Sequence, residues 1–125
     1  MTNRPTWAIR KNRRWKVVTS NLQSQLLPSE RSGIANSDCG TTIQYKIGKV
    51  KRSPNGVDVD KNVTCSRGIH AYTSLESAIS NCQLGIYEKI LVVYAPRWYG
   101  KKTNFSVRTR KERASQIYVS SLLKK

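Results

Sequence analysis

The sequence predicts an α+β domain dominated by strands, with a mostly antiparallel sheet of about five or six strands, one short helix at about residues 74–83 and basic terminal arms. Two observations support this class. Apolar residues gather into short runs that are continuous or alternate with polar residues, as strands require. A single segment combines a hydroxyl cap with helical spacing of apolar residues. The length of 125 residues suits one domain with a modest core.

Strand-like composition recurs along the chain, in residues 14–20, 42–50, 88–95, 104–110 and 115–122. Within residues 88–95, the stretch from Ile90 to Ala95 is continuously apolar, so this strand is expected to be buried on both faces. Within residues 42–50, Ile43, Tyr45 and Ile47 alternate with polar side chains and are expected to face the core. The polar residues 21–41 predict an irregular excursion between the first two strands.

The helix is expected to begin at a capping box, in which Thr73 supplies the hydroxyl and Glu76 follows three residues later. One apolar face of the helix would comprise Leu75, Ala78, Ile79 and Cys82. Gly85 is a suitable stop. Before the helix, residues 53–56 read Ser-Pro-Asn-Gly and predict a turn, and residues 57–63 predict a short edge strand.

Charge is distributed unevenly along the chain. There are 23 Lys and Arg residues against seven Asp and Glu, a net charge of +16. Most of the excess lies in residues 1–16 and 97–125, where Glu112 is the one carboxylate. The sequence therefore divides into a basic N-terminal arm (1–13), a single α+β domain (14–122) and a basic C-terminal end (123–125). Such a charge indicates an anionic partner: nucleic acid, a membrane face or an acidic protein surface.

Candidate anion-binding residues lie in the arm and in the late basic segment. They are Arg4, Arg10, Lys11, Arg13, Arg14, Arg108, Arg110, Lys111 and Arg113. Arg108 and Arg110 would share one face of a strand about 7 Å apart, a spacing that suits successive phosphates, with Lys111 and Arg113 in the turn that follows. The alternative is a solvated outer face, kept charged for solubility or to protect a sheet edge.

Aromatic residues are interleaved with these cations. Trp7 and Trp15 flank a basic stretch, and Trp98 and Tyr99 follow Arg97. This mixture suits stacking on single-stranded nucleic acid, but it equally suits anchoring into a neighbouring protein. We therefore expect Trp7, Trp15, Trp98 and Tyr99 to be protein-interface anchors. Because neither an RNP signature nor a C2H2 finger is present, sequence-specific base readout is not expected.

No established catalytic motif is present, so the sequence does not predict an enzyme. The alternative is a small enzyme that uses Cys65 as a nucleophile and His70 as its base. A turn at Gly68 followed by a packed strand explains the same residues without chemistry. The three cysteines, Cys39, Cys65 and Cys82, lack metal-binding spacing, and neither a metal nor a cofactor is predicted.

Several short motifs follow one another in an order that resembles a known family. They are Trp15-Lys16-Val17-Val18, Tyr45-Lys46-Ile47-Gly48-Lys49, Cys65-Ser66-Arg67-Gly68-Ile69-His70-Ala71, Leu75-Glu76-Ser77-Ala78, Ile90-Leu91-Val92-Val93 and Val107-Arg108-Thr109-Arg110. Together they resemble a small domain of unknown function found in bacterial, phage and giant double-stranded DNA virus proteins. The resemblance implies a compact α+β module and a viral source. It implies no activity, and no catalytic residue follows from it.

These observations together predict a non-enzymatic structural or interaction protein, a minor capsid-associated component of a large DNA virus particle. Its basic arms would dock on other virion proteins or on packaged DNA or RNA. The alternative is a free module that binds the phosphate backbone of nucleic acid without sequence specificity. No run approaches the roughly 18 apolar residues of a membrane span. The N-terminus lacks a signal-peptide pattern, so the expected location is the virion or otherwise the cytoplasm.

Overall fold

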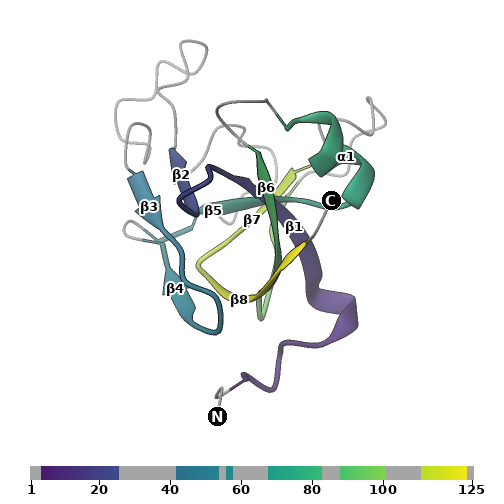
Figure 1. Ribbon diagram of the computed structural model, residues 1–125. Helices are drawn as coiled ribbons and strands as arrows, with labels where there is room; N and C mark the ends of the chain where they lie inside the picture. The colour runs from purple at the N-terminus through teal and green to yellow at the C-terminus, as the bar shows by residue number, and fades with distance from the viewer. Residues whose placement is uncertain are drawn as a thin grey trace.

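A computed structural model of the chain describes residues 4–25, 42–53, 56–57, 68–82, 88–100 and 111–123 (Figure 1). Its strands are β1 (Arg13–Val18), β2 (Gln23–Gln25), β3 (Thr42–Gln44), β4 (Val50–Arg52), β5 (Ile69–Tyr72), β6 (Lys89–Tyr94), β7 (Lys111–Ala114) and β8 (Gln116–Leu123). The helix α1 spans Leu75–Ser80, and a 3-10 turn spans Arg10–Asn12. The predicted fold class is confirmed: strands dominate, and the described part holds one short α-helix.

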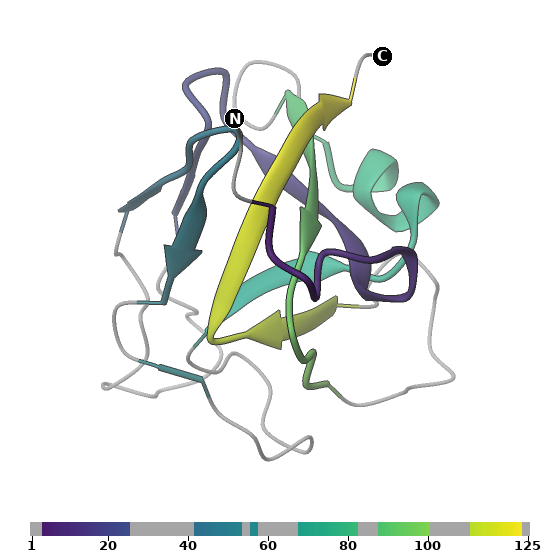
Figure 2. The same ribbon diagram turned by 90° about the horizontal axis from the view of Figure 1, so that it is seen from below.

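Six strands form one antiparallel sheet in the order β4-β8-β6-β1-β5-β7, and β2 pairs with β3 separately. β7 and β8 are consecutive in the chain, with Ser115 alone between them, yet three strands lie between them in the sheet. The sheet must therefore curl until its β7 edge returns to β8, as Figure 2 shows at the corner of the yellow strand. At this corner the amide of Ser53, just after β4, donates a 2.8 Å hydrogen bond to the Ser115 carbonyl.

The inner face of this curled sheet carries the main core. Its buried side chains are Val18, Ile43, Tyr45, Ile69, Ala71, Leu91, Val93, Ala95, Ala114, Ile117 and Val119. The prediction that the run at residues 88–95 is buried on both faces is confirmed, because Leu91 and Val93 join this core while Ile90 and Tyr94 are buried on the opposite face. The alternation predicted for residues 115–122 is confirmed at Ile117.

The outer face of β6 and β8 is covered by the N-terminal segment, as the purple trace across these strands shows in Figure 2. Ala8 is buried against Tyr94 and Tyr118, and Trp7 and Val92 pack around them. The backbone of this segment is folded locally, with a 3.1 Å hydrogen bond from the Ala8 amide to the Pro5 carbonyl. Residues 4–12 therefore pack on the domain whose start the sequence placed at residue 14.

One predicted strand is interrupted by a turn. Ile43 and Tyr45 are buried as expected, but Ile47 is 45% exposed, so its predicted core position is wrong. The chain turns between Lys46 and Lys49, where the Lys49 amide donates to the Lys46 carbonyl. Gly48 has φ +85°, a conformation that glycine adopts without strain. The single strand predicted for residues 42–50 is therefore two strands, β3 and β4.

The helix begins one residue later than the capping box predicted. Ser74, not Thr73, is the N-cap, and its Oγ accepts a 3.1 Å hydrogen bond from the Ser77 amide. The buried residues of α1 are Ser77 and Ala78, whereas Ile79 is 47% exposed, so the predicted apolar face is wrong at Ile79. The helix has only six residues, and small side chains face the sheet because β1 and β5 approach it closely.

Removing the cap gives a direct test of this local structure. We expect Ser74→Ala to lower the free energy of unfolding by about 1 kcal/mol, because the Ser77 amide loses its acceptor. Thr73→Ala is the matched control and should have a smaller effect. Urea unfolding of the two variants measures the difference. A larger loss for Thr73→Ala would show that Thr73, and not Ser74, caps the helix.

Two further segments differ from the sequence prediction. Lys111 and Arg113 were expected in a turn, but residues 111–114 form β7, which pairs with β5. Residues 23–25, inside the expected irregular excursion, form β2 and pair with β3. The strand expected at residues 104–110, most of the edge strand at 57–63 and the stop at Gly85 lie outside the described residues.

Candidate nucleic-acid interface

The described residues hold far more cations than carboxylates. They include 14 Lys and Arg residues but only three acids, Glu76, Glu88 and Glu112. Between two described residues there is one ion pair, in which Arg14 Nε donates to Glu112 Oε1 at 2.7 Å. Both side chains are about one-fifth exposed, so water screens this pair only in part. Since the whole chain has 23 basic and seven acidic residues, its own carboxylates can balance only a minority of its positive charge.

Aromatic rings are the neighbours of many of these cations. Six cations lie over rings in the described part: Arg4 over Tyr94 (5.0 Å), Arg13 over Trp15 (5.2 Å), Arg14 over Trp98 (5.6 Å), Lys16 over Tyr45 (5.5 Å), Arg97 over Tyr99 (5.1 Å) and Lys111 over Tyr72 (5.8 Å). Significant pairs of this kind usually occur about once per 70–80 residues. The ring quadrupoles thus help to stabilise these six charges, including that of Arg14, which also pairs with Glu112.

Two of these pairs are joined into one row across three strands. Trp15 on β1 pairs with Tyr72 on β5, and Tyr72 pairs in turn with Lys111 on β7. Arg13 lies two residues before Trp15 on β1 and therefore shares its face, because side chains alternate along a strand. We call Arg13, Trp15, Tyr72 and Lys111 the cation–ring row. The two rings and Arg13 are half-buried, and Lys111 is exposed.

The row lies between two elements that cover the same outer face. Val92, the cross-strand partner of Trp15 on β6, packs in the cluster beneath the N-terminal segment. On the other side, Tyr72 is followed after two residues by α1. Figure 1 shows α1 beside β5 and β1, with the 3-10 turn at the start of β1. The partly buried rings of the row thus occupy the part of the face between these covers.

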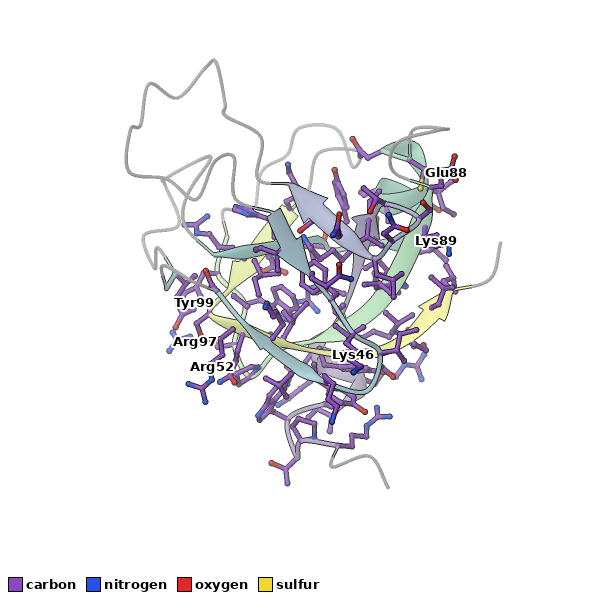
Figure 3. The ribbon with its side chains drawn as sticks, turned by 60° about the vertical axis from the view of Figure 1, so that its left-hand side comes forward. Lys46, Arg52, Glu88, Lys89, Arg97 and Tyr99 are labelled. Carbon is purple, nitrogen blue, oxygen red and sulfur yellow. The ribbon has the colours of Figure 1, made fainter. Side chains whose placement is uncertain are left out.

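A third cation–ring pair continues the sheet past β7. The backbones of Tyr99 and Arg113 exchange hydrogen bonds of 2.8 and 2.7 Å, so Tyr99 lies beside β7. Arg97 lies over the Tyr99 ring and is exposed. Figure 3 shows Arg97 and Tyr99 on the same side of the molecule as Arg52, away from Glu88 and Lys89. The Arg113 side chain itself is buried, 4% exposed.

The N-terminal cations flank the row at the start of β1. Arg10 and Lys11 are exposed in the 3-10 turn that leads into Arg13. The Arg13 Nε is buried and has no hydrogen-bond partner among the described residues. Arg4 is anchored instead within the chain, because its guanidinium donates to the Ala8 carbonyl at 2.9 and 3.2 Å.

Lys16 is a buried cation that the sequence did not single out. It is 5% exposed, and its Nζ donates a 2.6 Å hydrogen bond to the backbone carbonyl of His70. Burial, helped by the charge of Lys111, lowers the pKa of Lys16 to about 7. Burial also raises the pKa of Tyr45, whose hydroxyl accepts a 3.0 Å hydrogen bond from Ser24. The one available signal was that Lys16 shares the strand face of Val18.

The surroundings of His70 do not favour proton transfer. Burial and then the charges of Lys16, Lys111 and Arg113 lower the pKa of His70 to about 3, against a small opposing effect of the Gly68 backbone. An imidazole with so low a pKa is a weak general base near neutral pH. Cys65, its proposed nucleophile, lies outside the described residues. Within the described ranges no three His, Cys, Asp or Glu side chains come together as metal ligands.

The expected interface anchors have different environments. Trp7 packs in the cluster of Ala8 and Tyr94, and Trp98 packs against the core while its Nε1 donates to the Asn12 carbonyl at 2.8 Å. Trp15 and Tyr99 lie on the outer face instead. Of the candidate anion-binding residues, the structure brings Arg13 and Lys111 into one row, whereas Arg108 and Arg110 lie outside the described residues. Tyr72 was not predicted.

No helix in the described part is long and apolar enough to cross a membrane. The family resemblance of the sequence stays a prediction, and so do the viral source and the virion location that it implies. Comparisons of the chain with models of protein families, with curated proteins and with solved structures found no match.

Proposed function

We propose that this chain is a non-enzymatic interaction protein that binds nucleic acid through its phosphate backbone, without sequence specificity. The observation that carries the proposal is the charge ratio: the described residues hold 14 cations and three carboxylates, in a chain with 23 basic and seven acidic residues. Phosphates supply the missing counter-charge, and their contacts carry no sequence information.

The placement of the exposed cations supports nucleic acid over docking through tryptophans. Arg10, Lys11 and Lys111 are exposed, so they can reach phosphates without unfolding. Trp7 and Trp98 already have packing partners within the chain. Fewer of the predicted anchor residues are therefore available for docking on neighbouring proteins. The proposed setting, a particle of a large DNA virus, rests on the family resemblance.

Salt dependence tests the proposal. We expect the chain to bind duplex DNA at about 50 mM salt and to lose at least about tenfold in affinity by about 200 mM, because bound phosphates release counterions. Heparin should displace the DNA. Fluorescence anisotropy of a labelled duplex measures both effects. Absence of binding at low salt, or an affinity that salt does not change, would contradict the proposal.

A pair of double variants locates the contacts. Arg10→Gln with Lys11→Gln removes two exposed cations and should lower the slope of log K against log salt by about 2. Lys46→Gln with Lys49→Gln removes the same charge from exposed positions in the turn between β3 and β4. If both double variants lower the slope equally, the N-terminal segment is not the preferred contact.

A further inference from the structure

We propose that the cation–ring row is a stacking platform for single-stranded nucleic acid, with bases packed on Trp15 and Tyr72 and phosphates held by Arg13 and Lys111. The inference rests on the proposed function and adds a preference for unpaired bases. It makes the outer face of β1, β5 and β7 the binding surface.

The register of the sheet places the parts of this platform in order. Trp15 and Tyr72 are direct cross-strand partners, so their Cβ atoms lie about 5 Å apart on the same face. Lys111 is the partner of Tyr72 on the next strand. The row therefore runs from Arg13 to Trp15 along β1 and then across the sheet to Tyr72 and Lys111. In this order it presents a cation, two rings and a second cation. Cations at both ends allow a backbone to be held while its bases lie over the rings.

Single strands fit this order better than a duplex does. In a duplex the bases are stacked on each other, and only their edges reach a protein surface. Unpaired bases offer their flat faces, and stacking on aromatic side chains tolerates any sequence. The guanidinium of Arg13 lies over the Trp15 ring, 5.2 Å from the ring centroid, and is itself a planar group on which a base can stack.

Exposure and charge separate the row from ordinary core aromatics. Tyr45 and Tyr118 are almost completely buried, at 2% and 4%, and no base could reach them. Trp15 and Tyr72 are only half-buried, and Lys111 beside them is exposed. The row contains no carboxylate. The carboxylates of an acidic protein surface would pair with the cations but would not stack on the flat faces of the rings, so we favour nucleic acid.

The test compares three probes on ring variants: a labelled oligothymidylate, a duplex of equal length and heparin. We expect Tyr72→Leu to weaken oligothymidylate binding about tenfold, the usual scale for losing one stacked base. Binding of heparin should change little. Tyr72→Phe keeps the ring and should restore the affinity. Oligothymidylate should also quench tryptophan fluorescence, and heparin should not.

A charge variant keeps the test valid if Tyr72→Leu fails to fold. Lys111→Gln removes an exposed cation from the row, and Lys46→Gln removes one from the turn between β3 and β4, next to the opposite edge of the sheet. We expect Lys111→Gln to weaken oligothymidylate binding severalfold and Lys46→Gln to weaken it less. Thermal unfolding of each variant confirms that the fold is intact.

The possible outcomes distinguish the two proposals. If the chain binds neither heparin nor DNA, the proposed function is wrong. If heparin and duplex bind with the same affinity as oligothymidylate, and the row variants leave all three unchanged, only the stacking platform is wrong. Tight binding of polyglutamate that Lys111→Gln weakens would assign the row to an acidic protein instead.

Discussion

Replacing Lys16 with methionine is expected to raise the free energy of unfolding at pH 7, by on the order of 3 kcal/mol. In the folded chain, burial lowers the pKa of Lys16 from 10.5 to about 7, and each unit corresponds to about 1.4 kcal/mol of penalty on the charged form. Methionine fills a similar volume without a charge. The loss of the hydrogen bond to the His70 carbonyl offsets about 1 kcal/mol of the gain.

The lowered pKa of Lys16 also makes the free energy of unfolding depend on pH. Between about pH 7 and 10.5 the unfolded chain holds a proton on Lys16 that the folded chain releases, so the stability of the native sequence should rise with pH. Above about pH 10 the raised pKa of Tyr45 acts in the opposite direction, because the unfolded tyrosine ionises first. Stability should therefore be greatest near pH 10.

Denaturant unfolding from about pH 7 to about pH 10 checks both statements. Lys16→Met should be the more stable protein at pH 7 and should show a flatter rise with pH. Lys46→Met is the control, because Lys46 is exposed and its replacement should change neither quantity much. A Lys16→Met protein that is less stable and keeps the native pH slope would show that the lysine is ionised and well paired in the folded chain.

Deleting residues 1–9 is expected to destabilise the domain by about 3 kcal/mol or more. The deletion uncovers Tyr94 and Tyr118, which are now 8% and 4% exposed, and it removes the buried Ala8. A basic arm that served only to dock on a partner would leave the free energy of unfolding unchanged. The prediction therefore separates a structural segment from a free arm.

Urea unfolding of the shortened chain, monitored by circular dichroism, gives this free energy. The m-value should stay close to that of the full chain if unfolding remains two-state. Arg10→Gln with Lys11→Gln is the control, since it removes charge from the same region without uncovering apolar surface, and it should act within about 0.5 kcal/mol. Equal midpoints for the full and shortened chains would contradict the packing described for Ala8.

The sequence predicts those parts of the fold in which one local pattern is sufficient. The stretch from Ile90 to Ala95 is apolar at every position, and Ile117 and Val119 alternate with Gln116, Tyr118 and Ser120, so each pattern identifies its strand without knowledge of the rest. Local patterns fail where the backbone changes direction. Ile47 continues the alternation of Ile43 and Tyr45, but the turn with Gly48 in the left-handed region takes it out of the core.

The candidate interface is less predictable because it depends on pairing between distant segments. The excess charge and the neighbourhood of Arg13 to Trp15 are visible along the chain. The pairing of Trp15 with Tyr72 depends on the register of β1 against β5, which no local pattern encodes. The burial of Ala8 cannot be predicted for the same reason. No local pattern in this polar, basic segment indicates that the segment covers Tyr94 and Tyr118 on other strands.

The corner at Ser115 has a consequence for how the chain folds during synthesis. β7 and β8 border β6, β1 and β5 from opposite sides, so these three strands stay open at two edges until residues 111–123 have been made. Open edges of this kind pair readily with other chains. Pairing over such long sequence separations is also slow. The nascent chain is therefore open to pairing with other chains until the last strand closes the sheet.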